Sequence, residues 1–227
     1  KRVALIDLDS RQRTSVRYLE NRWNHGQKHA ITLPGPAAVV VADGEAAEAE
    51  LAQRFEQARG QDFILVDSPG RDSALARAAM ARADTLVTPI NDSFVDFDLI
   101  GEVDGDSFEV KRPSFYAELV WEARTRRARE QGRQMDWVIL RNRLSTLDAR
   151  NKQRVGAALD ALAKRIGFRV LPGLSERVIF REFFPRGLTL LDRAALTDFS
   201  LSHVAARNEL RTLIAGLNLP GVTEMAA

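Results

Sequence analysis

Residues 63–70, with the sequence FILVDSPG, constrain the fold more than any other stretch of the chain. The apolar run at 63–66 predicts a strand buried on both faces of a parallel sheet. Asp67 follows at the carboxyl edge, where open α/β sheets bind ligands, and Pro69 and Gly70 then break the strand into a turn. A carboxylate placed there can hold Mg²⁺ beside nucleotide phosphates. The alternative is an acid that only caps the turn.

The rest of the chain alternates strands and helices. Apolar runs predict further strands at residues 3–6, 85–90, 137–140 and 168–170. Residues 25–44 predict a loop, and helical patterns lie at about 17–24, 46–59, 73–83, 114–132, 148–165, 177–184 and 201–217. This order predicts an α/β fold with a doubly wound, mostly parallel sheet flanked by helices. We expect a single domain over residues 1–227, with a helical insertion around 94–135.

Composition narrows the classes of protein to which the chain can belong. Of its 227 residues, 45% are hydrophobic, which is enough for a sizeable core. The chain has no Cys, so we expect no disulfides or thiol chemistry and a place in the reducing cytoplasm. No apolar run is long enough to span a membrane. His25 and His29 have the spacing of a metal-binding pair, but the polar stretch around them predicts no metal site.

Charge is distributed unevenly along the chain. Residues 43–110 carry 16 acids and 5 bases, a net charge of −11, whereas residues 111–186 carry 18 bases and 8 acids, a net charge of +10. The bases are almost all Arg, which can bind two phosphate oxygens at once. This segregation indicates a surface that faces a polyanion, although helices with solvated charged faces would give the same counts.

Two further acids, Asp7 and Asp9, close the first predicted strand. They are two residues apart in an extended backbone, so their side chains lie on the same side of it. Two carboxylates at one strand end repel each other unless a cation or a water network separates them. The pair is therefore a candidate for cation chemistry, and the alternative is that both are exposed turn residues.

Together these motifs resemble the ParA/MinD branch of the P-loop ATPases, and within it the MipZ family of division-plane positioning ATPases. In this resemblance Asp67 takes the Walker B position, and the Arg-Gln-Arg that follows Asp9 by two residues is the MipZ version of that loop. The resemblance covers nearly the whole chain except the variable region around residues 25–60. Its segments are IDLDSRQRT at 6–14, FILVDSPG at 63–70, TPINDSFVDFD at 88–98, MDWVILRNRL at 135–144 and FPRGLTLLD at 184–192.

The chain departs from the family in one respect. The deviant P-loop, KGGxGK followed by Ser or Thr, is absent from these residues. Its backbone amides and lysines would form most of the phosphate cradle. We expect this loop upstream of Lys1, so that the chain lacks the first strand and the P-loop helix of a P-loop ATPase domain. A degenerate relative that binds no nucleotide is the alternative.

The resemblance implies a weak, regulatory ATPase with ATP and Mg²⁺ as cofactors. Asp9 matches the switch I acid that positions the attacking water, and Asp7 matches the neighbouring acid near the metal. Asp67 matches the Walker B acid that holds Mg²⁺, and Gly70 belongs to the switch II loop that binds the cofactor. The resemblance also places Asn142 and Pro172 in the pocket that binds the adenine base of ATP.

The resemblance also implies partners. In the family, ATP joins two subunits into a homodimer that binds double-stranded DNA without sequence preference, binds ParB and inhibits assembly of FtsZ. Arg150 and Arg154 are one turn apart on a predicted helix and share a face, and with Arg177 they are expected to contact DNA. The alternative is that these arginines only solvate the helix. The implied location is cytoplasmic and associated with the nucleoid.

Two other functions fit the same residues. A ParA-type chromosome partition ATPase would share the chemistry without acting on FtsZ, and a non-enzymatic DNA-binding scaffold would bind DNA whether or not nucleotide is present. A MinD-like membrane ATPase is disfavoured, because residues 216–227 contain Pro220 and no Lys or Arg. A basic amphipathic helix that binds membranes needs those cations.

Overall fold

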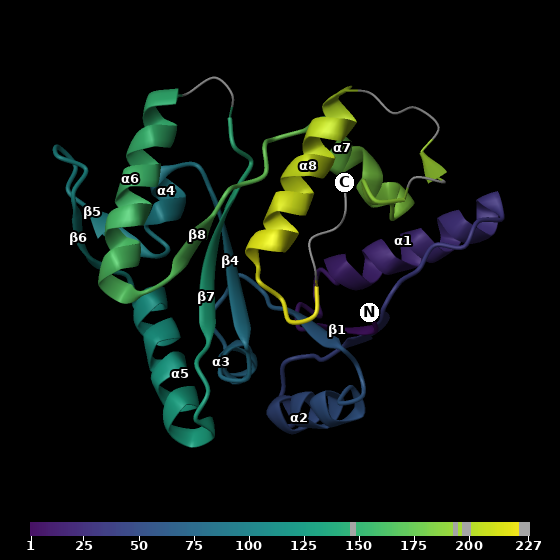
Figure 1. Ribbon diagram of the computed structural model, residues 1–227. Helices are drawn as coiled ribbons and strands as arrows, with labels where there is room; N and C mark the ends of the chain where they lie inside the picture. The colour runs from purple at the N-terminus through teal and green to yellow at the C-terminus, as the bar shows by residue number, and fades with distance from the viewer. Residues whose placement is uncertain (146–148, 193–194, 197–200, 223–227) are drawn as a thin grey trace. The chain divides into compact units, whose positions relative to one another are not determined.

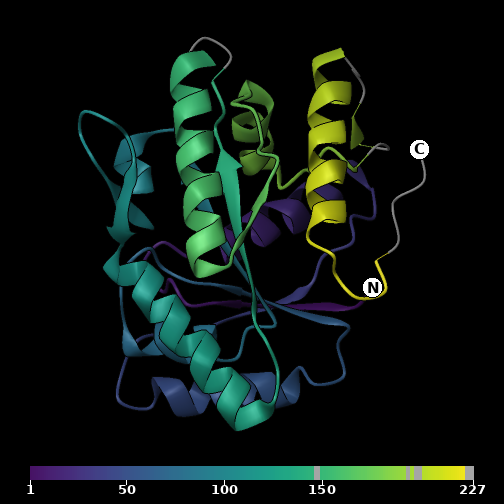
Figure 2. The ribbon, with the colours of Figure 1, turned by 60° about the vertical axis from the view of Figure 1, so that its left-hand side comes forward.

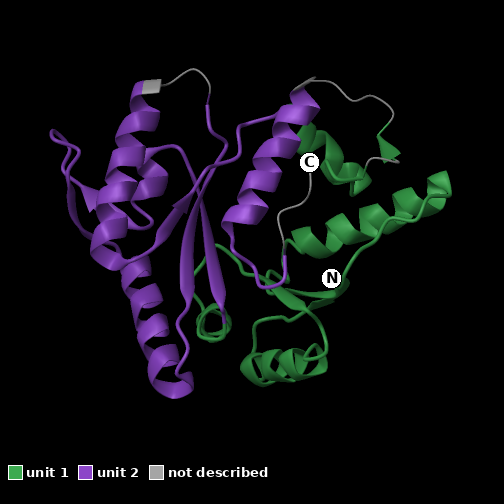
Figure 3. Cartoon of the chain, viewed as in Figure 1, with its two compact units in different colours: residues 1–82, 178–199 green, residues 83–177, 200–227 purple. Residues whose placement is uncertain are grey.

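The computed structural model describes residues 1–145, 149–192, 195–196 and 201–222 of the chain. The chain divides into two compact units (Figure 3). Unit 1 comprises residues 1–82 and 178–199, and unit 2 comprises residues 83–177 and 200–227. Each unit contains a parallel sheet with helices against it, which confirms the predicted α/β class. That the two units together form one ATPase domain stays a prediction.

A three-stranded parallel sheet forms the centre of unit 1 (Figure 1). Strand β1 (Val3–Asp7) lies between β2 (Ala37–Val40) and β3 (Phe63–Asp67). Helix α1 (Thr14–His29) lies on one side of β1, and α2 (Ala47–Gln57) lies on the other. The remaining helices of the unit are α3 (Ala74–Met80), α7 (Val178–Phe183) and the 3₁₀ helix η1 (Phe184–Arg186).

The core of unit 1 lies between its sheet and the helices α2 and α3. Side chains alternate along a strand, so Ile6 and Leu8 point to the same face, where both are buried. Leu51 of α2 and Leu75 of α3 complete this cluster. Asp7 lies between Ile6 and Leu8 in sequence and therefore faces the side of the sheet on which α1 lies.

Unit 2 is built on a second parallel sheet, in which β7 (Asp136–Asn142) lies between β4 (Thr85–Asn91) and β8 (Arg169–Leu171). Helices α5 (Phe115–Gln131) and α6 (Ala149–Ile166) lie on one side of this sheet, and α8 (Leu201–Gly216) lies on the other, as Figures 1 and 2 show. The apolar face of α6 is fully buried through Val155, Leu159 and Leu162.

The segment predicted as a helical insertion is only partly helical. Between α4 (Phe94–Phe97) and α5, the chain forms an antiparallel hairpin of β5 (Gly101–Val103) and β6 (Val110–Pro113). Asp104 stabilises the turn by accepting hydrogen bonds from the amides of Asp106 and Ser107, at 3.0 and 2.9 Å. This hairpin was not predicted, because its strands are short and carry charged side chains.

Two local predictions were wrong. Residues 25–44 are not all loop, since α1 continues to His29 and β2 follows at Ala37–Val40. Strand β3 is not buried on both faces, because Leu65 in its middle is 58% exposed. Among the described residues β3 pairs only with β1, and β4 likewise pairs only with β7 and leaves Val87 38% exposed. Both strands therefore have one open edge in the described part of the chain.

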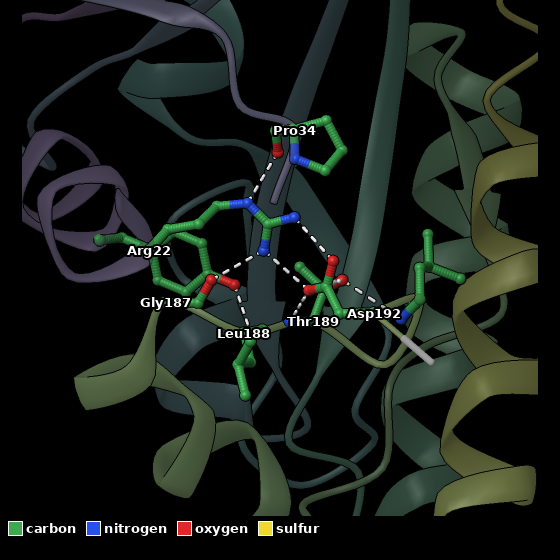
Figure 4. A network of polar contacts seen from close by, with 8 residues as sticks. Arg22, Pro34, Gly187, Leu188, Thr189 and Asp192 are labelled. Atoms are coloured by element: carbon green, nitrogen blue, oxygen red, sulfur yellow. Dashed lines mark hydrogen bonds and ion pairs between the residues drawn. The ribbon is translucent and has the colours of Figure 1, made fainter. Parts of the chain in front are cut away.

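A buried ion pair attaches α1 to the chain that follows η1 (Figure 4). Arg22 Nη2 lies 2.6 Å from Asp192 Oδ1, and both side chains are only 8% exposed. The guanidinium also donates to the carbonyl oxygens of Pro34 at 2.7 Å and Gly187 at 2.9 Å. Gly187 has a φ of 61°, and a Cβ there would lie 2.1 Å from the Arg22 amide nitrogen. This close approach requires glycine.

The protonation of Asp192 is set by the same network. Burial alone raises the pKa of this carboxyl, but hydrogen bonds from Arg22 and Thr189 outweigh it, so its pKa is lowered. The hydrogen bond to Asp192 in turn raises the pKa of the Arg22 guanidinium. The buried charges are therefore paired and hydrogen-bonded to each other and to backbone, which is the condition under which a buried charge is tolerated.

Candidate functional site

The candidate acids of unit 1 meet at the carboxyl edge of its sheet. Parallel pairing of β1 with β3 places Asp7 directly opposite Asp67. The backbone amide of Leu8 then donates to the Asp67 carbonyl oxygen at 2.8 Å, which extends the pairing by one residue. Asp7 is fully buried, whereas Asp67 is partly exposed. The sequence motif thus becomes two neighbouring carboxylates at the edge where α/β sheets bind ligands.

Asp7 organises the loop between β1 and α1. Its Oδ1 accepts a hydrogen bond from the Asp9 amide at 2.9 Å, and its Oδ2 accepts one from the Val16 amide at 3.3 Å. The residue at the N-cap of α1, Arg13, is left-handed with φ 50° and provides no capping side chain. Asp7 therefore supplies the acceptor that the helix start lacks. Whether Asp7 also contacts a metal stays a prediction.

Asp9 begins the same loop and is partly exposed. Its Oδ1 accepts a hydrogen bond from the Gln12 amide at 3.1 Å, and this contact lies at the surface of the protein. The two acids that looked alike in the sequence thus have different surroundings. Asp7 is buried and accepts hydrogen bonds from backbone amides, whereas Asp9 is partly exposed in the loop that follows.

Asp67 has a partner that the sequence did not reveal. The Ser15 hydroxyl, in the first turn of α1, donates to Asp67 Oδ2 at 2.5 Å. The two residues are 52 positions apart, and only the pairing of β1 with β3 brings them together. No motif marks Ser15, so sequence reasoning had no means of selecting it.

The residues at this edge fit Mg²⁺ in the way that nucleotide-binding proteins use it. Within the described residues, no group of three or more His, Cys, Asp and Glu side chains could hold a metal by itself. ATPases bind Mg²⁺ through one or two carboxylates together with phosphates and water, and Asp67 is the partly exposed carboxylate at this edge; that it binds Mg²⁺ stays a prediction. Gly70 lies exposed in the loop after β3, and the next residue, Arg71, forms an ion pair with Asp43.

The candidate adenine residues lie in unit 2, at the carboxyl edge of its own sheet. Asn142 ends β7 opposite Asn91 of β4, and the two residues line a cleft of about 430 Å³ together with Pro89, Ile90, Val95, Asp96, Leu99 and Arg143. Pro172 directly follows β8, which pairs with β7. The next residue, Gly173, approaches the Arg141 carbonyl so closely that a Cβ would lie 2.4 Å from it. The structure thus brings Asn142 and Pro172 to one edge.

The three candidate DNA-binding arginines, all in unit 2, differ in their surroundings. Arg150 is exposed near the start of α6. Arg154, one turn later, has its guanidinium carbon 4.6 Å from the centre of the Phe108 ring in the hairpin turn. Arg177 is paired with Glu209 at 2.6 Å, and its side chain is 21% exposed. The hydrogen bond to Glu209 raises the pKa of Arg177. Arg150 is therefore the most available of the three.

Comparison with solved structures identifies the fold. A chain of the MinC:MinD cell division protein complex of Aquifex aeolicus is 16% identical, with a TM-score of 0.51 over 99% of this chain and 88% of that chain. The MinD cell division protein of the same organism is 15% identical, covers 95% and 85% of the two chains, and has a TM-score of 0.48. A plasmid partition protein from Borrelia burgdorferi is 14% identical, covers 82% and 83%, and has a TM-score of 0.48. The first match shows that the fold is of the MinD type.

A family model identifies the chain more closely. The model described as ATPase MipZ matches residues 1–221, and the chain therefore belongs to the MipZ family of ATPases. The resemblance seen in the sequence motifs is thereby confirmed. No relative was found among curated protein sequences. None of the helices in the described part of the chain is long and apolar enough to cross a membrane.

Proposed function

We propose that this protein is an ATP-dependent dimeric switch that positions the cell division plane. The observation that carries the proposal is the pair Asp7 and Asp67 at one sheet edge, followed by the Asp9 loop, in a chain that matches the MipZ family over 1–221. ATP and Mg²⁺ are the cofactors. The proposed partners are a second copy of the chain, ParB, FtsZ and nonspecific double-stranded DNA, and the proposed location is the nucleoid.

The chain's own residues take distinct roles in this proposal. Asp67 holds Mg²⁺, which neutralises phosphate charge when it is bound, and Asp9 orients the attacking water. Asp7 keeps the Asp9 loop in place through its two backbone hydrogen bonds. Asn142 and Pro172 contact adenine, and Gly70 lets the loop after β3 approach the phosphates.

The proposal requires a phosphate-binding loop, and residues 1–227 contain no glycine-rich motif that could serve as one. Sequencing the coding region on the 5′ side of codon 1 tests whether the gene supplies such a loop. A coding region without a glycine-rich loop would contradict ATP hydrolysis by this protein and leave DNA binding as its remaining activity.

Light scattering of the full-length protein tests the switch. We expect a monomer with ADP and a dimer with ATP, because ATP would be held between two subunits. A mass that does not respond to nucleotide would contradict the proposal and favour a DNA-binding scaffold. Sedimentation of FtsZ polymers with and without the ATP-bound protein then separates a division-positioning function from ParA-type partition, which would leave FtsZ unaffected.

Replacing both Arg150 and Arg154 with Ala should weaken binding of the ATP-bound protein to DNA of any sequence. Each phosphate contact contributes a slope of about −0.9 to log K against log salt, so losing two contacts should reduce the slope by about two units. Fluorescence anisotropy with a DNA duplex over a salt series measures this change.

The matched control for these arginines is Arg126→Ala on α5. Arg126 is likewise an exposed arginine, and it pairs with Glu130 four residues later. The control should leave the salt slope unchanged. Undiminished DNA binding after loss of Arg150 and Arg154 would refute their assignment.

A further inference from the structure

We infer that Ser15 is a positioning residue that holds the Asp67 carboxylate in the orientation needed for Mg²⁺ and couples it to the loop that carries Asp9. The inference rests on the proposed function, since it assumes that Asp67 binds Mg²⁺ beside a nucleotide. It adds a residue that belongs to none of the motifs in the sequence.

The contact itself is specific. The Ser15 hydroxyl donates to Asp67 Oδ2 at 2.5 Å. A serine hydroxyl has one proton to donate, and here it is directed to this carboxylate. Among the described residues, no donor reaches Asp67 Oδ1. One oxygen is thus fixed by the protein, and the other is left for a metal or a metal-bound water.

The position of Ser15 gives the contact a second consequence. Ser15 and Val16 are adjacent in the first turn of α1, and they bind to Asp67 and to Asp7, respectively. The loop between β1 and this turn contains Asp9 and the left-handed Arg13. A shift of the loop therefore moves the start of α1, and through the Ser15 hydroxyl it moves the Asp67 carboxylate. Ser15 thus links the water-positioning acid to the metal-binding acid.

The test separates metal positioning from a purely structural role. In the full-length protein, the affinity for a fluorescent ADP analogue is measured with excess Mg²⁺ and with EDTA. We expect Ser15→Ala to reduce the affinity gain that Mg²⁺ provides by about tenfold, the size expected for one hydrogen bond to a charged group. Affinity in EDTA should not change, and Ser15→Thr, which keeps the hydroxyl, should retain the gain.

Two further variants sharpen the result. Thr14→Ala changes an exposed residue in the same helical turn and should behave as the wild type. In an Asp67→Asn background, Ser15→Ala should have no additional effect on the Mg²⁺-dependent gain, because the carboxylate that it positions is no longer present.

Each contrary result has its own meaning. An unchanged Mg²⁺-dependent gain in Ser15→Ala would overturn the role of Ser15 while leaving the proposed function intact. Equal weakening with Mg²⁺ and with EDTA would show that the hydroxyl only stabilises the fold, which also overturns the inference. A wild-type protein whose ADP affinity does not respond to Mg²⁺ would overturn the proposed function, and the inference with it.

Discussion

Asp9→Ala in the full-length protein should abolish ATP hydrolysis while leaving ATP binding intact. Asp9 is partly exposed, and its carboxylate lies at the surface of the loop after β1. A side chain that orients water in the transition state contributes about 10²–10⁴-fold to the rate, so a loss of that size is expected. Phosphate release and nucleotide binding, measured separately, check both parts. The ATP-bound variant should remain a dimer.

The control for this prediction is Asp9→Asn. The amide oxygen of Asn can still accept the hydrogen bond that the Gln12 amide now donates to Asp9. Loop order is therefore preserved while the charge is removed. If Asp9 orients water through its carboxylate, both variants lose hydrolysis. Wild-type turnover in Asp9→Asn would assign Asp9 a role in ordering the loop instead.

Arg22→Ala should reduce the free energy of unfolding by about 3–5 kcal/mol, the range for removing one partner of a buried ion pair. The variant leaves the Asp192 carboxylate without its counter-charge and removes the donor that serves the carbonyl oxygens of Pro34 and Gly187. Urea unfolding followed by circular dichroism measures the change. A loss below about 1 kcal/mol, the size of a surface pair, would contradict the structural importance of this network.

Glu20→Ala is the matched control for Arg22→Ala. Glu20 lies on the same helix and forms an exposed ion pair with Arg13 at 3.5 Å, so its removal should cost less than about 1 kcal/mol.

The effect of Arg22→Ala on the free energy of unfolding should also depend on pH. The folded-state pKa of Asp192 is lowered, so stability from the pair is present above the carboxyl's ordinary pKa and lost as pH falls through the lowered value. The difference between wild type and Arg22→Ala should therefore narrow in acid.

The elements that the sequence predicted well are those whose signal is local. The apolar run at 63–66 became β3, and the amphipathic pattern that places Val155, Leu159 and Leu162 on one face became α6. Strand β2 was missed because it is short and contains two Ala residues, and its stability comes from pairing with β1. Pairing of that kind depends on residues far away in the chain.

The same distinction applies to the candidate site. Asp7, Asp9 and Asp67 could be selected as candidates because an acid at a strand end is visible in the sequence. Their different surroundings were not visible, since burial of Asp7 and the hydrogen bond from Ser15 to Asp67 depend on how α1 lies against the sheet. The ion pair between Arg177 and Glu209 was likewise hidden, because its partners are 32 positions apart. The candidate residues could be selected from the sequence, whereas the residues that each of them contacts could not be predicted.

The open edges of β3 and β4 bear on how samples of residues 1–227 behave. Each edge offers unpaired backbone groups within the described residues, beside the exposed side chains of Leu65 and Val87. Such edges recruit strands from other molecules. Association by this route would grow with protein concentration, continue beyond two subunits and proceed equally with ADP, with ATP or without nucleotide. An increase in mass therefore counts as switching only when it stops at the dimer and reverses as ATP is consumed.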